Sequence, residues 1–409
     1  MQEETSLDGG FPWELGVFDA HCHPTDTLSS IDEIEAMRAT ALTIMATRAQ
    51  DQELVCQVAS RYQQKSGNLG YGRIIPSFGW HPWFSHQVFD DTTMSQAVNQ
   101  DYLSSIKVEH YKSALSPLIK DEAEDDHFLH ELPVPWSLRS LLDQTRERLL
   151  RYPHALVGEI GIDKAFRIPK AWGPDSNQAN KEGASASESP QRTRTPGTRE
   201  GRALSPYRVK LSHQRAVLKA QLLLAGELQR PVSLHSVQAH GAILETLCSL
   251  WKGYERKIPS KRQQKISKSV PQAGERKGEP QNDSTRYLEG NSSQSTTQSL
   301  PFPPRVCMHS YSGPVEQLSQ FLHPTVPAEI YFSFSSVISF PDGMNTKSYA
   351  VVKALPDDRI LVESDLHRAG PEMDDMLERA VRNICDIRGW PLDEGIRILG
   401  DNWRRFVFG

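Results

Sequence analysis

The chain has 409 residues, of which 38% are hydrophobic, 24% charged and 8% aromatic, and its formal net charge is −5. This balance argues against a protein coated in basic surface, although a local patch or bound metal ions could still receive phosphate groups. We find no run of about 18 apolar residues, so no membrane-spanning helix is expected. The first ten residues are polar and acidic, and we expect no signal peptide there.

The five cysteines, Cys22, Cys56, Cys248, Cys307 and Cys385, are scattered and form no C-x-x-C pair. An odd, scattered set argues against a disulfide framework or a zinc ribbon and favours a reducing compartment. We therefore expect a cytoplasmic or nuclear protein.

Short apolar runs recur along the chain, and most are followed by turn residues and a longer helical pattern. The candidate strands cover residues 16–21, 42–47, 73–78, 155–160, 231–235, 305–309, 330–334 and 360–363. The candidate helices cover residues 31–38, 53–64, 138–151, 207–229, 239–251, 315–322 and 373–388. Alternating strands and helices with continuously apolar strands predict an α/β protein with a buried parallel sheet. Eight such units favour a (β/α)₈ TIM barrel.

We expect one barrel domain over residues 12–409, with three insertions. Residues 88–131 carry some helical periodicity and are predicted to be a partly ordered insertion. The other two insertions cover residues 167–205 and residues 252–304. The second of these is basic in its first half and rich in Ser, Thr and Gln in its second half. Both have too little apolar content to offset the entropy lost on ordering. We predict that both are disordered. The first two insertions begin at the rim where barrel active sites lie.

Residues able to bind metal ions occur at the ends of five candidate strands. His21 and His23 are two positions apart, so both imidazoles point to the same side of an extended chain and Cys22 points away. Glu159, His235, His309 and Asp365 each follow an apolar run. Any one of them could be a satisfied buried group or a helix cap, but their coincidence at five of eight strand ends predicts a shared site.

The residue types indicate the chemistry of this site. Four imidazoles and two carboxylates suit Zn²⁺ or Mn²⁺, and Mg²⁺ less naturally. Six ligands exceed the need of one tetrahedral ion but fit two ions that share a bridging carboxylate. Two-metal sites suit phosphoryl transfer, in which they neutralise the attacking and leaving oxygens.

Several motifs resemble, in order, those of the TatD-related deoxyribonucleases, a group of amidohydrolase-like metal-dependent hydrolases. The resemblance covers nearly the whole chain outside the three insertions. The motifs are Asp19-Ala-His-Cys-His23, Gly79-Trp-His-Pro82, Gly158-Glu-Ile-Gly-Ile-Asp163, Pro231-Val-Ser-Leu-His-Ser236, His309-Ser-Tyr-Ser-Gly313, Glu363-Ser-Asp365 and Asp401-Asn402.

The resemblance implies a nuclease acting on DNA, often as a 3′–5′ exonuclease, with two divalent ions (Mg²⁺, Mn²⁺ or Zn²⁺). His21, His23 and Asp365 would bind one ion, His235 and His309 the other, and Glu159 would bridge them. Glu159 and Asp365 are the expected catalytic residues, with Asp365 as the general base. His81 and Asp163 would lie near the substrate or behind the ligands.

The chain departs from the family pattern at the rim of the site. Lys164 stands where an aromatic residue is usual, Leu366-His367-Arg368 where a proline is usual, and His-Ser-Tyr replaces His-Cys-Phe. Fungal members with long insertions of this kind are described as partners of a cell-cycle ubiquitin-ligase subunit, which implies a protein partner.

Three functions remain open. The chain could be a phosphodiesterase acting on DNA, an amidohydrolase acting on a small amide, ester or lactone, or an interaction protein that retains the site. Many two-metal amidohydrolases bridge their ions with a modified lysine on strand four. Glu159 occupies that strand end here, which favours the phosphodiesterase.

Overall fold

Eight parallel strands form one sheet in the computed structural model, which describes residues 10–63, 71–119, 123–170, 203–258, 299–340 and 346–409. The strand order is β1-β2-β3-β7-β9-β10-β11-β12. The strands are β1 (Phe18–Cys22), β2 (Ala41–Met45), β3 (Ile74–Phe78), β7 (Leu156–Asp163), β9 (Val232–Val237), β10 (Arg305–Met308), β11 (Glu329–Phe334) and β12 (Ile360–Val362). All eight predicted strands are present, and the predicted TIM-like barrel is confirmed.

The strands are apolar on both faces because both faces are covered. In β2, Leu42 and Ile44 belong to the large core between the sheet and its helices. Ala41, on the other face, packs with Phe18 and Trp403 in a second cluster. This double burial explains why the strands read as continuous apolar runs rather than as alternating patterns.

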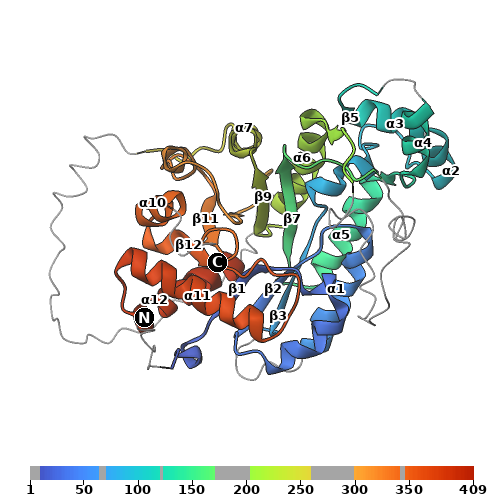
Figure 1. Ribbon diagram of the computed structural model, residues 1–409. Coiled ribbons are helices and arrows are strands. Elements are labelled where there is room, and N and C mark those ends of the chain that lie inside the picture. Colours follow the sequence, from blue (N-terminus) through green and yellow to red (C-terminus); the bar gives the residue numbers. More distant parts are fainter. Residues whose placement is uncertain (1–9, 64–70, 120–122, 171–202, 259–298, 341–345) are drawn as a thin grey trace, which may run out of the picture.

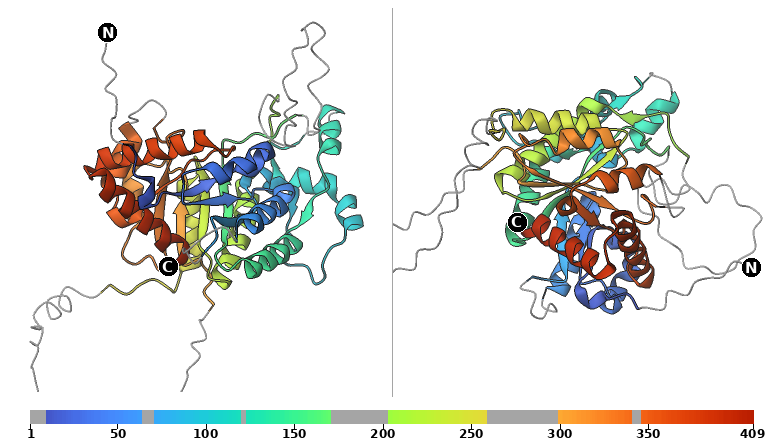
Figure 2. Two further views of the ribbon diagram at one scale, coloured as in Figure 1. Left: turned by 90° about the horizontal axis from the view of Figure 1, so that it is seen from below. Right: turned by 90° about the vertical axis from the view of Figure 1, so that its left-hand side faces the viewer.

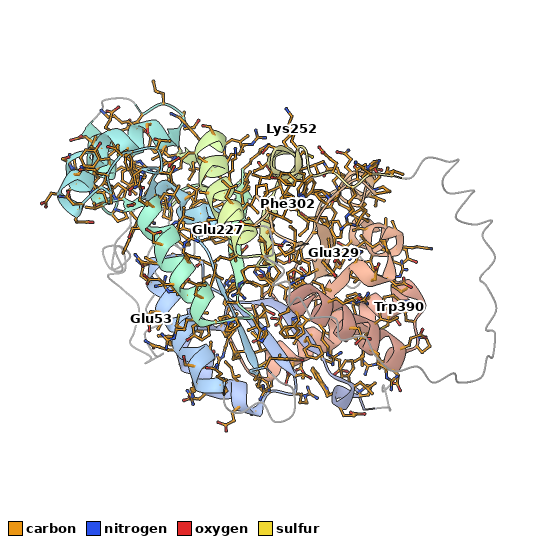
Figure 3. The ribbon with its side chains drawn as sticks, turned by 180° about the vertical axis from the view of Figure 1, so that it is seen from behind. Glu53, Glu227, Lys252, Phe302, Glu329 and Trp390 are labelled. Carbon is orange, nitrogen blue, oxygen red and sulfur yellow. The ribbon has the colours of Figure 1, made fainter. Side chains whose placement is uncertain are left out.

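Helices surround the sheet (Figures 1 and 2). They are α1 (Ala49–Tyr62), α5 (Leu138–Arg151), α6 (Leu211–Glu227), α7 (His240–Trp251), α9 (Leu318–Phe321), α10 (Thr346–Ala354), α11 (Pro371–Arg388) and α12 (Leu392–Phe408). An ion pair between Arg146 of α5 and Glu227, at the end of α6, joins two of them. Glu227 is labelled in Figure 3. Within the described parts of the chain, none of the helices combines the length and apolar character needed to cross a membrane.

The helix predictions need three corrections. The helix expected over residues 207–229 begins at Leu211, because β8 (Arg208–Val209) pairs with β5 (Leu115–Ser116) instead. Of the helix expected over residues 31–38, residues 31–36 lie in a 3₁₀ helix, Leu28–Ala36, and the last two follow its end. Helices α10 and α12 were not predicted.

Helix α12 closes one end of the barrel. The indole of Trp403 stacks on Phe18 at the start of β1, with ring centroids 4.4 Å apart, and its Nε1 donates to Thr43 Oγ1 at 3.1 Å. Phe406 is fully buried in the same cluster. Because α12 fills the end where the strands begin, the opposite end, where they finish, is left for a site.

Residues 88–131 contain three helices, α2 (Gln100–Ser105), α3 (Lys107–Ala114) and α4 (Ala123–Glu131), that form a group beside α6 (Figure 1). Two short strand pairs connect this part to the rest of the chain. Strand β4 (Val88–Phe89) pairs with β6 (Trp136–Ser137), and β5 pairs with β8. Most of the two segments predicted to be disordered, residues 171–202 and 259–298, lies outside the described residues.

Candidate metal centre

The six predicted ligands meet at the carboxyl ends of the strands. His21 lies at the end of β1, Glu159 in β7 and His235 in β9. His23, His309 and Asp365 follow the ends of β1, β10 and β12. Five of the six are buried, and the Asp365 side chain, 17% exposed, opens the group to solvent.

Glu159 lies at the centre of the group, and five imidazole nitrogens lie within 3.5 Å of its two oxygens. Its two oxygens face different histidines, as expected of a carboxylate that bridges two ions. The distances to Oε2 are 3.4 Å from His21 Nε2 and 3.3 Å from His23 Nε2, and those to Oε1 are 2.7 Å from His235 Nδ1, 3.2 Å from His81 Nε2 and 3.5 Å from His309 Nε2.

The first predicted ligand set is brought together. The Nε2 atoms of His21 and His23 are 3.0 Å apart, and Asp365 Oδ1 lies 3.9 Å from the first and 3.8 Å from the second. As predicted, Cys22 points away, with its Sγ 3.5 Å from the Thr43 carbonyl oxygen. These three side chains form one group that could hold a metal ion.

The second predicted ligand set, His235 and His309, is not brought together in one group. His309 groups with His21 and Glu159, whereas His235 groups with His81 and Glu159. The rings of His235 and His309 are 6.0 Å apart. His81, predicted to lie near the substrate or behind the ligands, is therefore as close to Glu159 as the predicted ligands are.

The hydrogen bonds of His81 favour its predicted role behind the ligands. Its Nδ1 accepts from the backbone N–H of Trp83 at 3.1 Å, so in a neutral ring the proton is on Nε2. Burial lowers the pKa of His81 to about 4, which keeps the ring neutral. His81 Nε2 can then donate to Glu159, and a nitrogen that carries a proton does not bind a metal ion.

Other polar side chains orient the imidazoles. Ser233 Oγ lies 2.8 Å from His21 Nδ1, and both oxygens of Glu363 lie 3.2 Å from His309 Nδ1. Asp163 Oδ2 lies 3.3 Å from His235 Nε2. Partners of this kind fix the ring orientation of metal-binding histidines.

Gly161 allows β7 to approach β9 within the site. A Cβ at this position would lie 2.0 Å from the carbonyl oxygen of His235. The second glycine of the motif Gly158-Glu-Ile-Gly-Ile-Asp163 is therefore required for steric reasons, because only a residue without a side chain fits at this position.

The buried carboxylates change the pKa values of the imidazoles. Burial opposes a charge on His235, but the negative charge of Glu159 and the hydrogen bond to Asp163 raise its pKa to about 9. Burial also opposes a charge on His309, whose pKa the charges of Glu363 and Asp365 raise to about 10. The pKa of Glu159 lies well below its usual value, because the nearby histidines outweigh the effect of burial.

This donor set fits divalent metal ions. The facing Nε2 atoms of His21 and His23 can share at most one proton between them, and a cation satisfies both lone pairs. Buried nitrogen and carboxylate donors are the ligands that Zn²⁺ and Mn²⁺ prefer. The number and identity of the ions stay predictions.

The rim of the site contains aromatic residues. Trp83 Nε1 donates to Asp163 Oδ2 at 2.6 Å, and its ring stacks on Phe166 with centroids 4.9 Å apart. Trp80 and Phe84, which also follow β3, are buried in a core cluster. On the other side of the site, the exposed His367 stacks on His23 with centroids 5.1 Å apart.

The model of one known family, described as TatD related DNase, matches residues 18–408. The chain belongs to this family. A relative from Schizosaccharomyces pombe, the "Cut9-interacting protein scn1", is 34% identical over 96% of this chain and 98% of its own length. An uncharacterized deoxyribonuclease from Saccharomyces cerevisiae is 26% identical over 87% of this chain and 84% of its own length.

A solved structure supports the fold alone. It is that of an uncharacterized amidohydrolase from Saccharomyces cerevisiae, which superposes with a TM-score of 0.52 and 11% identity over 96% of this chain and 99% of that one. The TatD family match and the buried histidine and carboxylate groups together identify a hydrolase-type chain with a candidate metal site.

Three residues that support the site had no predicted role. Ser233 lies two positions before His235 in β9, and Glu363 lies two before Asp365, so their spacing placed them on the same side as the predicted ligands. Gln214 of α6, which hydrogen bonds to the backbone of Asp163, carried no such signal.

Proposed function

We propose that the chain is a metal-dependent phosphodiesterase that hydrolyses DNA, in the manner of a 3′–5′ exonuclease. The observation that carries this proposal is the contact of Glu159 with five imidazoles at the open end of the barrel. His21, His23, Glu159, His235, His309 and Asp365 would hold two divalent ions. When bound, such ions lower the pKa of a water molecule and offset negative charge on phosphoryl oxygens.

The residues of the chain have distinct roles in this proposal. Asp365 is the most exposed of the six and accepts the proton of the attacking water. The water oxygen bonds to phosphorus, the bond from phosphorus to the leaving oxygen breaks, and that oxygen takes a proton from solvent. Glu159 keeps its negative charge because its pKa is low. His81 donates to Glu159 and holds its orientation.

The amidohydrolase alternative has less support. The position on β7 where many two-metal amidohydrolases carry a modified lysine is occupied by Glu159. The match to a DNase family supports a phosphodiester substrate.

The test is a parallel assay with added Mn²⁺, Mg²⁺ or Zn²⁺. A 5′-labelled single-stranded DNA, a chromogenic phosphodiester and a chromogenic lactone are each incubated with the wild-type chain and with Glu159→Gln. We expect the DNA to be shortened stepwise from its 3′ end by the wild type only, because a neutral amide bridges two cations poorly. Turnover of the lactone alone, or equal DNA cleavage by both proteins, would reject the proposal.

A second function, binding to a protein partner, is supported by the name of the Schizosaccharomyces pombe relative, the "Cut9-interacting protein scn1". We propose that this chain binds the counterpart of Cut9, and the family resemblance implies that this partner is a subunit of a cell-cycle ubiquitin ligase. Co-purification of the two proteins, repeated with Glu159→Gln, tests the proposal. Binding that persists in the variant would show that the interaction does not depend on the metal centre, and absence of binding in both would reject it.

A further inference from the structure

A second candidate site lies beside the metal centre, where β5 and β8 meet the end of β7. It is a cavity of about 500 Å³. Three of its lining residues are cations, and three more are polar and uncharged. They are Lys164, Arg208 and Lys210, and Ser116, Ser212 and Gln214.

Segments distant in sequence build this cavity. Ser116 of β5 is paired with Arg208 of β8, which places residues 88–131 against the chain that leads into α6. Lys210 adds two hydrogen bonds to this junction. Its backbone N–H donates to the Ala114 carbonyl oxygen at 2.8 Å, and its Nζ donates to the Ser113 carbonyl oxygen at 2.6 Å. Lys164 completes the cavity from the barrel side, directly after the end of β7.

The charge of the cavity points to an anionic ligand. No carboxylate lines it, and in the described part of the chain no ion pair involves Lys164 or Arg208, both of which are exposed. Lys210 uses one of its three N–H donors within the protein. Helix α6 starts at this place, and the first turn of a 17-residue helix adds partial positive charge. Unpaired cations around a concave surface attract and hold polyanions.

One wall of the cavity is connected to the metal centre. Gln214 Oε1 accepts from the Asp163 backbone N–H at 2.8 Å, and its Nε2 donates to the Asp163 carbonyl oxygen at 3.0 Å. Asp163 in turn lies 3.3 Å from His235. Lys164 is the next residue, so its Cα is about 3.8 Å from that of Asp163. The cavity and the candidate metal centre thus share a wall through Gln214 and Asp163.

We propose that this cavity binds a backbone phosphate of the nucleic-acid strand whose neighbouring phosphodiester is hydrolysed at the metal centre. Lys164 and Arg208 are the main contacts. The inference rests on the proposed function and adds to it a substrate contact outside the predicted metal ligands, at the junction of β5, β8 and the end of β7.

The experiment measures binding of a 5′-fluorescein single-stranded DNA of 12 nucleotides by anisotropy. The titration is done with Mn²⁺ present at low temperature, and gel electrophoresis verifies that the DNA stays intact. Lys164→Ala/Arg208→Ala is compared with Lys219→Ala/Arg397→Ala, which removes the same charge from exposed positions on α6 and α12 outside the cavity. A third variant, Lys164→Arg/Arg208→Lys, keeps the charge.

We expect the cavity variant to bind at least about tenfold more weakly at low salt. Its plot of log K against log salt should be less steep by about 0.7, the contribution of one neutralised phosphate on a single strand. The control variant should retain wild-type affinity, and the charge-keeping variant should stay within about twofold. Equal losses in the cavity and control variants would overturn the proposal.

Inorganic phosphate serves as a second probe, because a free anion could occupy the same cavity. Phosphate binding that depends on Lys164 and Arg208, without any effect of these residues on DNA binding, would overturn the assignment to nucleic acid. DNA cleavage that is insensitive to the cavity variant would overturn this inference alone. Cavity-dependent DNA binding without cleavage, with any of the three metals, would support the inference and reject the proposed function.

Discussion

Ser364 donates two hydrogen bonds to the carboxylate of Asp19, one from its backbone N–H at 3.0 Å and one from Oγ at 2.5 Å. The backbone N–H of Asp365 also donates to the His21 carbonyl oxygen at 3.0 Å. These contacts join β1 and β12, the first and last strands of the sheet. We call this junction of β1 and β12 the seam. His21 lies on its β1 side and Asp365 on its β12 side, so the seam positions the candidate ligand group of His21, His23 and Asp365.

Asp19→Ala should therefore weaken metal binding without removing a ligand. The backbone and side-chain donors of Ser364 would be left buried without a partner, at a cost of about 1–3 kcal/mol of folding free energy. We expect metal affinity, measured by calorimetric titration, to fall about 10- to 100-fold. Asp32→Ala, at an exposed carboxylate outside the site, is the control. Unchanged metal affinity in Asp19→Ala would show that the seam does not position the ligands.

Ser233→Ala tests the orientation of one imidazole. The substitution removes the hydroxyl that lies 2.8 Å from His21 Nδ1 and leaves every candidate ligand in place. We expect roughly tenfold weaker metal binding, with a smaller effect on the thermal midpoint. Ser249→Ala on the exposed face of α7 should leave both quantities unchanged. Equal metal affinity in the two variants would mean that the Ser233 hydroxyl does not orient His21.

The strands and most ligands could be predicted from the sequence because each depends on a local pattern. His21, Glu159 and His235 each belong to an apolar strand, and parallel strands end at one rim. The position of His81 depends on the tertiary arrangement of the loop after β3, which brings its ring to 3.2 Å from Glu159.

Helix α12 shows why some elements could not be predicted. Gly395 and Gly400 interrupt its helical pattern and have low helix propensity. A Cβ at Gly395 would lie 2.2 Å from Cys385 Sγ, and one at Gly400 would lie 3.3 Å from the Gly16 carbonyl oxygen. Tertiary packing against α11 and the start of the barrel thus requires the residues that weaken the local signal.

Deleting residues 171–202 should preserve the fold. The two ends of this segment lie opposite each other, because the Lys170 backbone N–H donates to the Ala203 carbonyl oxygen at 2.8 Å and Pro169 forms an antiparallel bridge with Leu204. A two-residue Asn-Gly turn can join such a pair. We expect the thermal midpoint of the shortened chain to stay within about 3 °C of the wild type, a change of less than about 1 kcal/mol. A much larger decrease would show that the segment contributes to the folded core.

A second histidine cluster, His86, His110 and His213, should make stability depend on pH. Burial lowers the pKa of His86 to about 3 and that of His110 to about 4, whereas the unfolded value is near 6.5. Between these values the unfolded chain binds more protons, so stability decreases as pH falls below 6.5. At pH 5 each of these two histidines should lower the free energy of unfolding by about 2 kcal/mol relative to pH 8.

His110→Gln should reduce this pH dependence. The glutamine amide can still donate to the His86 carbonyl oxygen, which His110 Nε2 contacts at 2.7 Å, but it does not titrate. We expect the difference in unfolding free energy between pH 5 and pH 8, measured by denaturant titration, to be about 2 kcal/mol smaller in the variant than in the wild type. His127→Gln, at a side chain that is 77% exposed, is the control. The same pH dependence in His110→Gln as in the wild type would contradict the prediction.

The metal content of the purified chain tests the central claim most directly. After incubation with excess Mn²⁺ or Zn²⁺ and removal of free metal, inductively coupled plasma mass spectrometry should find about two ions per chain in the wild type, the number expected of a carboxylate-bridged pair. Glu159→Gln should retain about one or none, because it lacks the bridging charge. Absence of bound metal in the wild type, or two ions retained by Glu159→Gln, would contradict the account.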